Sequence, residues 1–451
     1  MNETLWKSIQ QFDFDHPLGE YSFSIRLANE NKWTKDFTEK AILEYKKFMY
    51  LAAISDVMVS PSAIVDTVWH QHLIFSQSYQ DFCVLVGKQI QHIPSTHQKE
   101  QAEQFRLAKE RTKRIYNEHF GAQPKAIWEY DAMLASLKLE PAKLKTGFFA
   151  LYGVLVFSLL TVPFYYLLKP VYIHIDNPYF ILGFLGLVLP AYVITSLYTK
   201  NRFKQIARDF DRQSFVYHLK PFELVYLKSQ KLADVINGAI SELIHAGVLN
   251  VNAYSRIYIS KEIDNLSGEQ LQVVSELKDR GEMLYPQLLG QLQAKAIFRN
   301  TAKSMDVFKW HFSQSKQFAQ LFYLNFTVFA TLIMFPLIRL ATGIVRDKPI
   351  FQIALLTAGL VIFTVNHLYK LDQQFCSCII PDLYKSAILP AIKDEQDWRW
   401  NYFLYGSAAL TATLVPLVNY ERSRGGDGGG ANSCGSSCGS SCGSCGGCGG
   451  D

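Results

Sequence analysis

The sequence predicts a mainly α-helical membrane protein. Three observations support this prediction: uncharged apolar runs of about 20 residues, helical apolar periodicity outside those runs, and a C-terminus rich in Gly, Ser and Cys. The expected architecture is a helical N-terminal bundle, then a polytopic α-helical membrane region with a small winged-helix-like α+β cytoplasmic insertion, and finally a disordered C-terminal tail. With 451 residues, of which 49% are hydrophobic, the chain has room for about three domains.

Residues 1–140 show the apolar periodicity of an all-α cytoplasmic domain. Thr34 is a suitable N-cap for one helix. Ser60 with Pro61 is a start signal for a second helix, with Ser as the cap and Pro at the first helical position. Gly121 closes a third, highly charged helix. The apolar residues expected to line the buried face of the first helix are Phe37, Ile42, Leu43, Phe48, Leu51 and Ala52.

Two pairs of uncharged apolar runs, within residues 147–198 and 319–369, predict transmembrane helices. Each run is long enough to cross a hydrocarbon layer of about 30 Å. A fifth run, 402–419, is shorter and richer in Thr and Ser, so it is only a possible span. No Asp, Glu, Lys or Arg lies inside the first, second or fourth span, and only Asn366 and His367 come near to such a residue, close to a span end. This argues against a transporter or pump. The four longer runs are 147–168, 179–198, 319–338 and 350–369.

Basic residues around the spans predict their orientation. Three lysines closely precede the first span and four basic residues follow the second, whereas the connecting loop, 169–178, contains one lysine. By the positive-inside rule, the N-terminus, residues 199–318 and the segment 370–420 are expected in the cytoplasm, apart from the possible fifth span. The chain begins without the basic and apolar regions of a signal peptide. We therefore expect a multi-pass protein of the bacterial cytoplasmic (inner) membrane, with the lipid bilayer as one partner.

Residues 199–318 are expected to contain a small winged-helix-like domain. A helix over KLADVINGAISELIHAG places Val235, Ala239 and Leu243 on one face, together with Leu249 just beyond it. Two short β-prone pieces, VLNVN and SRIYIS, and a polar helix follow, which is the order of elements in a winged helix.

The exposed face of that helix bears on nucleic-acid binding. A winged helix that binds DNA needs several basic or amide side chains there. The face here is mixed and partly acidic, and the net charge of +5 is small, so no nucleic-acid partner is favoured. A protein partner of the cytoplasmic domains is expected instead. The residues of this face are Lys231, Asp234, Asn237, Ser241, Glu242 and His245.

The stretch VDTVWHQHL, residues 65–73, contains two histidines that a helix would separate. At about 100° per residue, His70 and His72 point about 160° apart, so one helix cannot bring both to the same metal ion. Asp66 and His70, at positions i and i+4, lie on the same side of the helix and can interact.

This pair leaves three interpretations open. In the first, both histidines are structural: His72 is buried and bonded to a backbone carbonyl, and Asp66 orients His70. In the second, Asp66 and His70 bind a divalent metal ion together with a distant third ligand. In the third, His70 is a general base oriented by Asp66, although no nucleophile is identifiable. The distant ligands considered for the second interpretation are His16, Cys83 and His119.

The C-terminal segment 421–451 is rich in Gly, Ser and Cys and is expected to be disordered, because it cannot bury a core. Its thiols could bind soft metal ions, form disulfides if exported, or be modified. The spacing of the last three is similar to an iron–sulfur run but lacks the flanking proline. The cysteines are Cys434, Cys438, Cys442, Cys445 and Cys448.

Two sets of motifs are similar to known protein families. The first comprises SFSIRLANENKW, EYKKF, PSAIVDTVWHQHL, SYQDFC and YNEHFGAQPKAIW, within roughly residues 20–130. This part resembles the domain of glycine-rich domain-containing proteins, known in plants and bacteria, and the resemblance implies a domain type rather than a reaction. The second set comprises Pro221, Glu223, Leu224, Tyr226, Leu227, Ala239, Leu243 and Gly247. With the tail, it resembles an uncharacterised class of bacterial multi-pass membrane proteins, although Val248 stands where Leu is usual.

These observations favour a non-enzymatic, membrane-anchored binding or scaffold protein of the cell envelope, because the spans are nearly free of charge and no catalytic constellation is recognisable. A metal-handling membrane protein is the first alternative. It would use Asp66, His70 and the tail thiols, with a divalent or soft metal ion as cofactor. A membrane-bound hydrolase centred on His70 is the second alternative.

Overall fold

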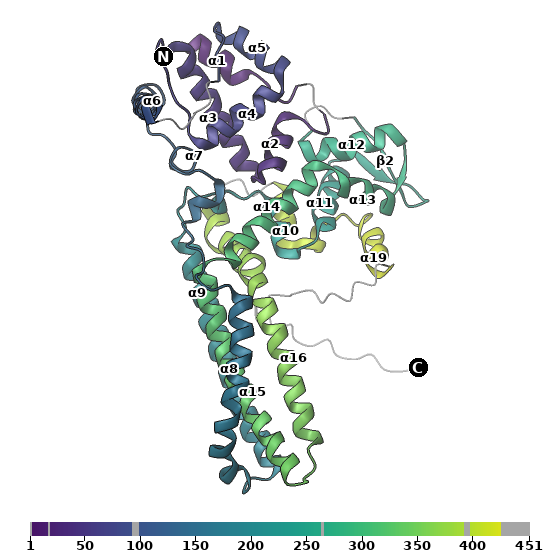
Figure 1. Cartoon of the computed structure of the whole chain (residues 1–451). Helices are drawn as coiled ribbons and strands as arrows, with labels where there is room; N and C mark the ends of the chain where they lie inside the picture. The colour runs from purple at the N-terminus through teal and green to yellow at the C-terminus, as the bar shows by residue number, and fades with distance from the viewer. Residues whose placement is uncertain (1, 17–18, 93–98, 263–265, 392–396, 425–451) are drawn as a thin grey trace.

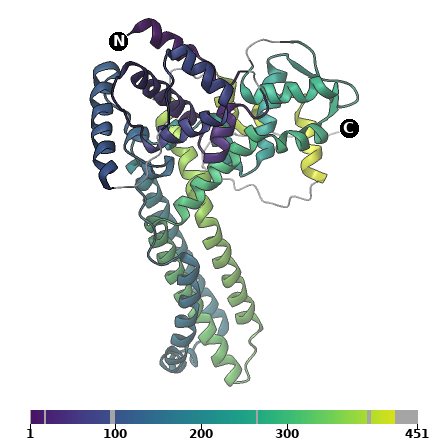
Figure 2. The same ribbon diagram turned by 45° about the horizontal axis from the view of Figure 1, so that its top comes forward.

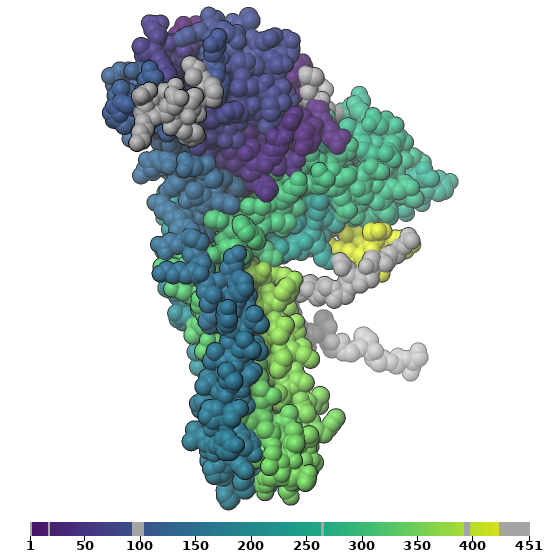
Figure 3. Space-filling model, viewed as in Figure 1, coloured from purple at the N-terminus to yellow at the C-terminus, as the bar shows by residue number. Residues whose placement is uncertain are grey.

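The computed structural model describes residues 2–16, 19–92, 99–262, 266–391 and 397–424. It is mainly helical and consists of a head and a long helical stalk (Figure 1). A turned view shows both soluble regions at the same end of the stalk (Figure 2). In the space-filling view the stalk projects from the head as a continuous column (Figure 3).

The stalk contains four helices that are long and apolar enough to cross a membrane. They are α8 (Thr146–Tyr172), α9 (Asn177–Asp209), α15 (Lys316–Val345) and a fourth, Phe351–Ala391, that begins with α16 (Phe351–Gln374). The four predicted runs are thereby confirmed as membrane-length helices. Beyond α16 the last of these continues through π-helical and short helical turns, at η3 (Phe375–Ile379), α17 (Ile380–Leu383), η4 (Tyr384–Ile388) and η5 (Leu389–Ala391).

Polar side chains join the stalk helices at the end nearest the head. Asn325 of α15 is fully buried, and its amide donates to Thr199 Oγ1 of α9 at 2.9 Å. The amide oxygen of Asn325 lies 3.1 Å from Nε2 of His367 on α16. Polar groups in a bilayer are stable when they find partners on neighbouring helices. His367, the polar residue noted near a span end, is therefore part of a contact between helices.

The N-terminal domain, residues 2–140, is helical as expected. Its elements are α1 (Glu3–Gln11), α2 (Phe23–Asn31), α3 (Lys35–Ile54), α4 (Ala63–Ile74), α5 (Ser76–Val86), α6 (Lys99–Phe120), α7 (Lys125–Trp128) and a 3-10 turn η1 (Met133–Leu137). Helix α3 begins after Thr34, whose Oγ1 accepts from the N–H of Phe37, as predicted. Gly121 ends α6 with φ of +79°, also as predicted.

Two details of this domain differ from prediction. The N-cap of α4 is Ser62, whose Oγ accepts from the N–H of Val65 at 3.2 Å. Ser60 instead donates its backbone N–H to Thr112 on α6, which holds the Ser60–Pro61 pair outside the helix. Leu43 is 38% exposed although it was expected on the buried face of α3.

The insertion domain, residues 215–313, contains helices and a small sheet. Its elements are η2 (Phe215–His218), α10 (Pro221–Ser229), α11 (Leu232–His245), β1 (Leu249–Val251), β2 (Arg256–Ile259), α12 (Gly268–Arg280), β3 (Met283–Leu284), α13 (Tyr285–Ala294) and α14 (Ala296–Ser313). The strands form an antiparallel sheet in the order β1-β2-β3, with Leu249 opposite Ile259 and Ile257 opposite Met283. The predicted apolar face of α11 is buried.

The prediction of a possible fifth span is wrong, because residues 402–419 do not form a membrane-length helix. They are divided among α18 (Trp398–Tyr405), η6 (Gly406–Ala409) and α19 (Val415–Arg424). Gly406, with φ of +60°, ends α18. Phe403 and Leu414 are fully buried, and α18 and α19 contact the insertion domain at α10, α11 and α13. The apolar residues of this run therefore pack on the head.

This C-terminal segment also covers part of the polar face of α11. Ser241 is fully buried, and its Oγ accepts from the backbone N–H of Thr411 at 3.0 Å. Arg399 of α18 pairs with Glu242 at 2.9 Å, and Arg422 of α19 pairs with Asp234 at 2.7 Å. Three residues of this face, Asp234, Ser241 and Glu242, are thus bound by the protein's own chain.

The carboxylate of Glu223 joins the N-terminal domain to the insertion domain. Its side chain is buried at the start of α10. One carboxylate oxygen accepts from the backbone N–H of Lys35 at 2.9 Å, and the other accepts from the backbone N–H of Lys220 at 2.7 Å. Lys35 is the first residue of α3, so a single side chain satisfies free N–H groups at the starts of two helices.

The buried position of Glu223 predicts a pH dependence of stability. Burial raises the pKa of Glu223 from its ordinary value of 4.5 to about 7, against the opposing effect of the two backbone donors. Because the folded-state pKa is the higher one, the folded protein binds more protons between these values. The contribution of Glu223 to stability is therefore full below about pH 4.5 and is lost as the pH rises through about 7. We expect Glu223→Gln to flatten this part of the stability profile.

The measurement is the apparent melting temperature of the full-length protein in detergent, followed across this pH range. Glu39→Gln is the matched control, because Glu39 lies on α3 and its side chain is 55% exposed. An unchanged slope in Glu223→Gln would show that other groups cause the pH dependence.

Candidate metal centre

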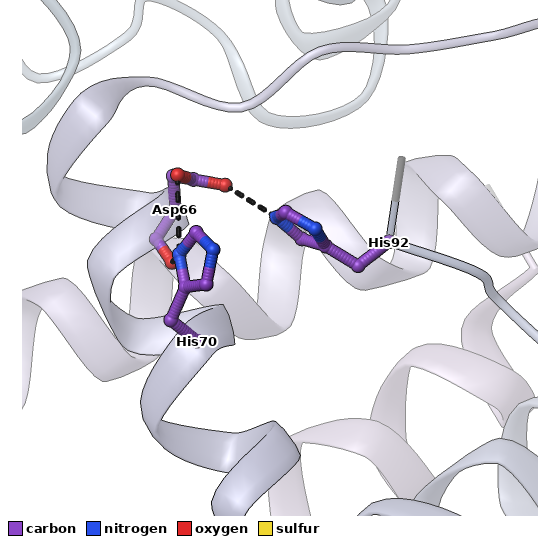
Figure 4. A group of neighbouring side chains, drawn as sticks. All are labelled: Asp66, His70 and His92. Carbon is purple, nitrogen blue, oxygen red and sulfur yellow. Dashed lines mark hydrogen bonds and ion pairs between the residues drawn. The ribbon is translucent and has the colours of Figure 1, made fainter. Parts of the chain in front are cut away.

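The predicted pair of Asp66 and His70 forms on α4. Oδ2 of Asp66 lies 3.2 Å from Nδ1 of His70, and the backbone carbonyl of Asp66 lies 2.9 Å from the same nitrogen (Figure 4). Both neighbours of Nδ1 are oxygens that accept, which assigns the proton of a neutral ring to Nδ1. Nε2 of His70 then carries the free lone pair, and an ion that binds through Nδ1 has to displace the proton of this nitrogen.

A second histidine, His92, completes this cluster. It follows α5 in a stretch of chain outside any helix or strand, and its Nε2 lies 2.9 Å from Oδ1 of Asp66. Its ring centroid is 4.3 Å from that of His70 and 4.6 Å from that of Trp69. One candidate ligand atom from each of Asp66, His70 and His92 lies within 4.8 Å of the other two. These three residues form the candidate metal centre.

His92 was missed by sequence reasoning, and the structure does not bring the three ligands considered in its place to the cluster. Cys83 is buried in the core of the N-terminal domain. His119 packs edge-on against Tyr50, with ring centroids 5.7 Å apart. His16 is exposed and, like the other two, lies outside the cluster found among the described residues. No spacing rule points to His92, because it lies 26 residues from Asp66 and outside any helix.

His72 is a structural residue, as the first interpretation proposed, but its partners differ from those expected. It is fully buried, and its Nδ1 and Nε2 lie 2.8 Å and 3.2 Å from the hydroxyls of Tyr45 and Ser78. Its partners are therefore side-chain hydroxyls rather than a backbone carbonyl. Burial lowers the pKa of His72 to about 4, so this ring is neutral at ordinary pH.

The candidate metal centre faces an open cavity of about 380 Å³. The side chains of Asp66, His70 and His92 are 36%, 56% and 14% exposed, so an ion and its waters have access to them. Two imidazoles and one carboxylate with open positions suit Zn²⁺, and the same set is typical of non-haem Fe²⁺ sites. The cavity is lined in addition by Trp69, Gln91, Phe105 and Lys109.

The tail cysteines lie outside the described residues. The structure therefore gives no position for Cys434, Cys438, Cys442, Cys445 or Cys448. Their predicted ability to bind a soft metal ion stays a prediction.

Comparisons with known proteins identify no relative. No family model, no curated protein and no solved structure matches the chain. The resemblances to glycine-rich domain-containing proteins and to the bacterial membrane class remain expectations from the motifs.

Proposed function

We propose that the chain is a multi-pass membrane protein whose head binds a divalent transition-metal ion through Asp66, His70 and His92. The observation that supports this most is the convergence of three ligand atoms within 4.8 Å from two separate segments of the chain. The four apolar membrane-length helices support the membrane part of the proposal.

The hydrogen bonds of the cluster are compatible with metal binding. Each imidazole directs a nitrogen at a different oxygen of Asp66, so the carboxylate and both rings are already oriented toward one another. Metal ions bind neutral imidazole and ionised carboxylate, and they release protons as they bind. An ion bound among the three side chains would thus replace the protons on the imidazole nitrogens that face Asp66. The three ligands are already close together there.

We further propose that the head is cytoplasmic and that the membrane is the bacterial inner membrane. The basic residues that flank the first two spans on the head side support this orientation. The described chain ends at Arg424 on the head, which supports a cytoplasmic start of the tail. The alternative to this proposal is a binding or scaffold role without metal. A hydrolase centred on His70 is less well supported, because no nucleophile has been identified.

Cobalt binding tests the proposed ligands, because Co²⁺ at a zinc-type site can be followed by visible absorbance. We expect full-length protein in detergent to bind about one equivalent. Asp66→Asn and His92→Ala should each weaken binding by roughly 100-fold or more, because each removes one of three protein ligands.

Two further variants make this titration specific. His16→Ala is the control, since His16 is an exposed histidine outside the cluster. A chain that ends at Arg424 lacks the tail thiols and should bind Co²⁺ as the full chain does at this site. If His92→Ala and the unaltered protein bound Co²⁺ with equal affinity, the result would contradict the proposal.

A further inference from the structure

A second cavity, of about 320 Å³, lies where the stalk meets the head. One wall is formed by Lys204 and Arg208 of α9. The other wall is formed by Asp382 of α17 with Lys385 and Ser386 of η4. Helices α9 and α17 contact each other, so the cavity lies between two helices that continue from the stalk.

The charge of this cavity is predominantly positive. Three cations, Lys204, Arg208 and Lys385, face one carboxylate, that of Asp382. In the part of the chain that the structure describes, none of the three cations has a carboxylate within ion-pair distance, although many other basic side chains of the head do. Unpaired cations gathered around a cavity favour an anionic ligand, and guanidinium and ammonium groups together suit phosphate.

The length of the apolar part of α9 places the cavity near the outer edge of the lipid headgroup layer. The apolar part of α9 ends near Tyr198, and Lys200 is the first charged residue beyond it. At 1.5 Å per residue, Lys204 and Arg208 lie about 6 and 12 Å past Lys200 along the helix. The headgroup layer on each side of the hydrocarbon core is about 5–8 Å thick. The flexible side chains of Lys204 and Arg208 therefore reach the outer part of this layer.

An apolar surface leads from the bilayer to the cavity. Val193 and Leu197 are 51% and 56% exposed on the stalk. Leu197 is seven residues before Lys204 and eleven before Arg208, which places all three on one face of α9 at helical spacing. A lipid whose acyl chain lies along Val193 and Leu197 would thus have its headgroup at the cavity.

From this geometry we propose that the cavity binds the phosphate-bearing headgroup of an anionic phospholipid. The unpaired cations supply the charge recognition, and the exposed face of α9 supplies the contact with an acyl chain. Basic pockets between transmembrane helices are a recognised way of holding such headgroups. This proposal is independent of the metal centre, which lies in the N-terminal domain.

The test counts the lipids that remain bound to full-length protein. The protein is reconstituted in mixed vesicles of phosphatidylglycerol and phosphatidylcholine, extracted into detergent and analysed by native mass spectrometry. We expect preferential retention of phosphatidylglycerol. The variant Lys204→Gln/Arg208→Gln/Lys385→Gln should retain at least about tenfold less of it, because three contacts to the headgroup are lost.

The control variant is Lys200→Gln/Arg202→Gln/Lys370→Gln. It removes the same number of charges at the same membrane boundary but none from the cavity lining. Equal losses in both variants would overturn the proposal, because they would indicate diffuse surface attraction. Melting temperatures in pure phosphatidylcholine should agree for all three proteins, which checks that they are folded.

A soluble competitor distinguishes a lipid from a free phosphate compound. Excess glycerol 3-phosphate offers the same phosphate chemistry without an acyl chain. We expect it to leave phosphatidylglycerol bound. Complete displacement by this competitor would assign the cavity to a soluble phosphate and overturn the lipid proposal.

Discussion

Replacing Phe312 with alanine is expected to destabilise the protein by about 3–5 kcal/mol. Phe312 is fully buried at the end of α14, where the head joins the stalk. Its ring stacks on Phe375, the first residue of η3 just beyond α16, with centroids 3.6 Å apart and an interplanar angle of 8°. It also contacts the ring of Phe203 on α9, at 5.8 Å. One side chain thus links the insertion domain to two stalk helices, and truncation leaves a cavity among them.

The effect of Phe312→Ala can be measured as the shift of the denaturation midpoint of the full chain in detergent. Trp310→Ala is the matched control, because Trp310 lies on the same helix and is 64% exposed. We expect its effect in detergent to stay within about 0.5 kcal/mol. Similar shifts for the two variants would contradict the packing of the head on the stalk described here.

Replacing Glu44 with alanine is expected to cost the N-terminal domain about 3–5 kcal/mol. Glu44 is a buried carboxylate on α3. It accepts from the hydroxyl of Tyr116 on α6 at 2.8 Å and from Nε1 of Trp128 on α7 at 2.7 Å, and it pairs with Lys47 at 2.8 Å. Its removal leaves an ammonium group and two polar donors without their shared acceptor, in a largely buried place.

Tryptophan fluorescence during urea denaturation would follow this loss, since Trp128 reports on the site directly. Glu118→Ala serves as the control, because Glu118 lies on α6 and its side chain is 61% exposed. A midpoint for Glu44→Ala that coincides with that of Glu118→Ala would show that the buried network contributes little.

The sequence was sufficient to predict the stalk, because a charge-free run of 20 residues has few alternatives to a membrane helix. It was insufficient for residues 402–419, whose apolar side chains serve equally well to cover α10 and α11. A membrane span and a segment packed on the head differ only in what surrounds the apolar side chains. The sequence alone does not show these surroundings. The α4 start was misplaced by two residues for a similar reason, since Ser60 donates to the distant Thr112.

The candidate metal centre was predictable in part. The spacing of Asp66 and His70 predicts their contact, because residues at i and i+4 share a helix face. The same geometry separates His72 from them, and the structure places that residue in the core. His92 reaches Asp66 through the path of the chain after α5, which no periodicity describes. Local pairs are thus predictable from the sequence, whereas a third ligand depends on tertiary structure.

Elemental analysis of the purified protein is the most direct test of the proposed function. Full-length protein would be prepared without added metal or chelator, alongside His92→Ala and a chain that ends at Arg424. The proposed centre predicts about one equivalent of a transition metal in the full-length and shortened proteins, and a large loss in His92→Ala. Metal that is absent from all three, or that disappears only with the tail, would contradict a centre formed by Asp66, His70 and His92.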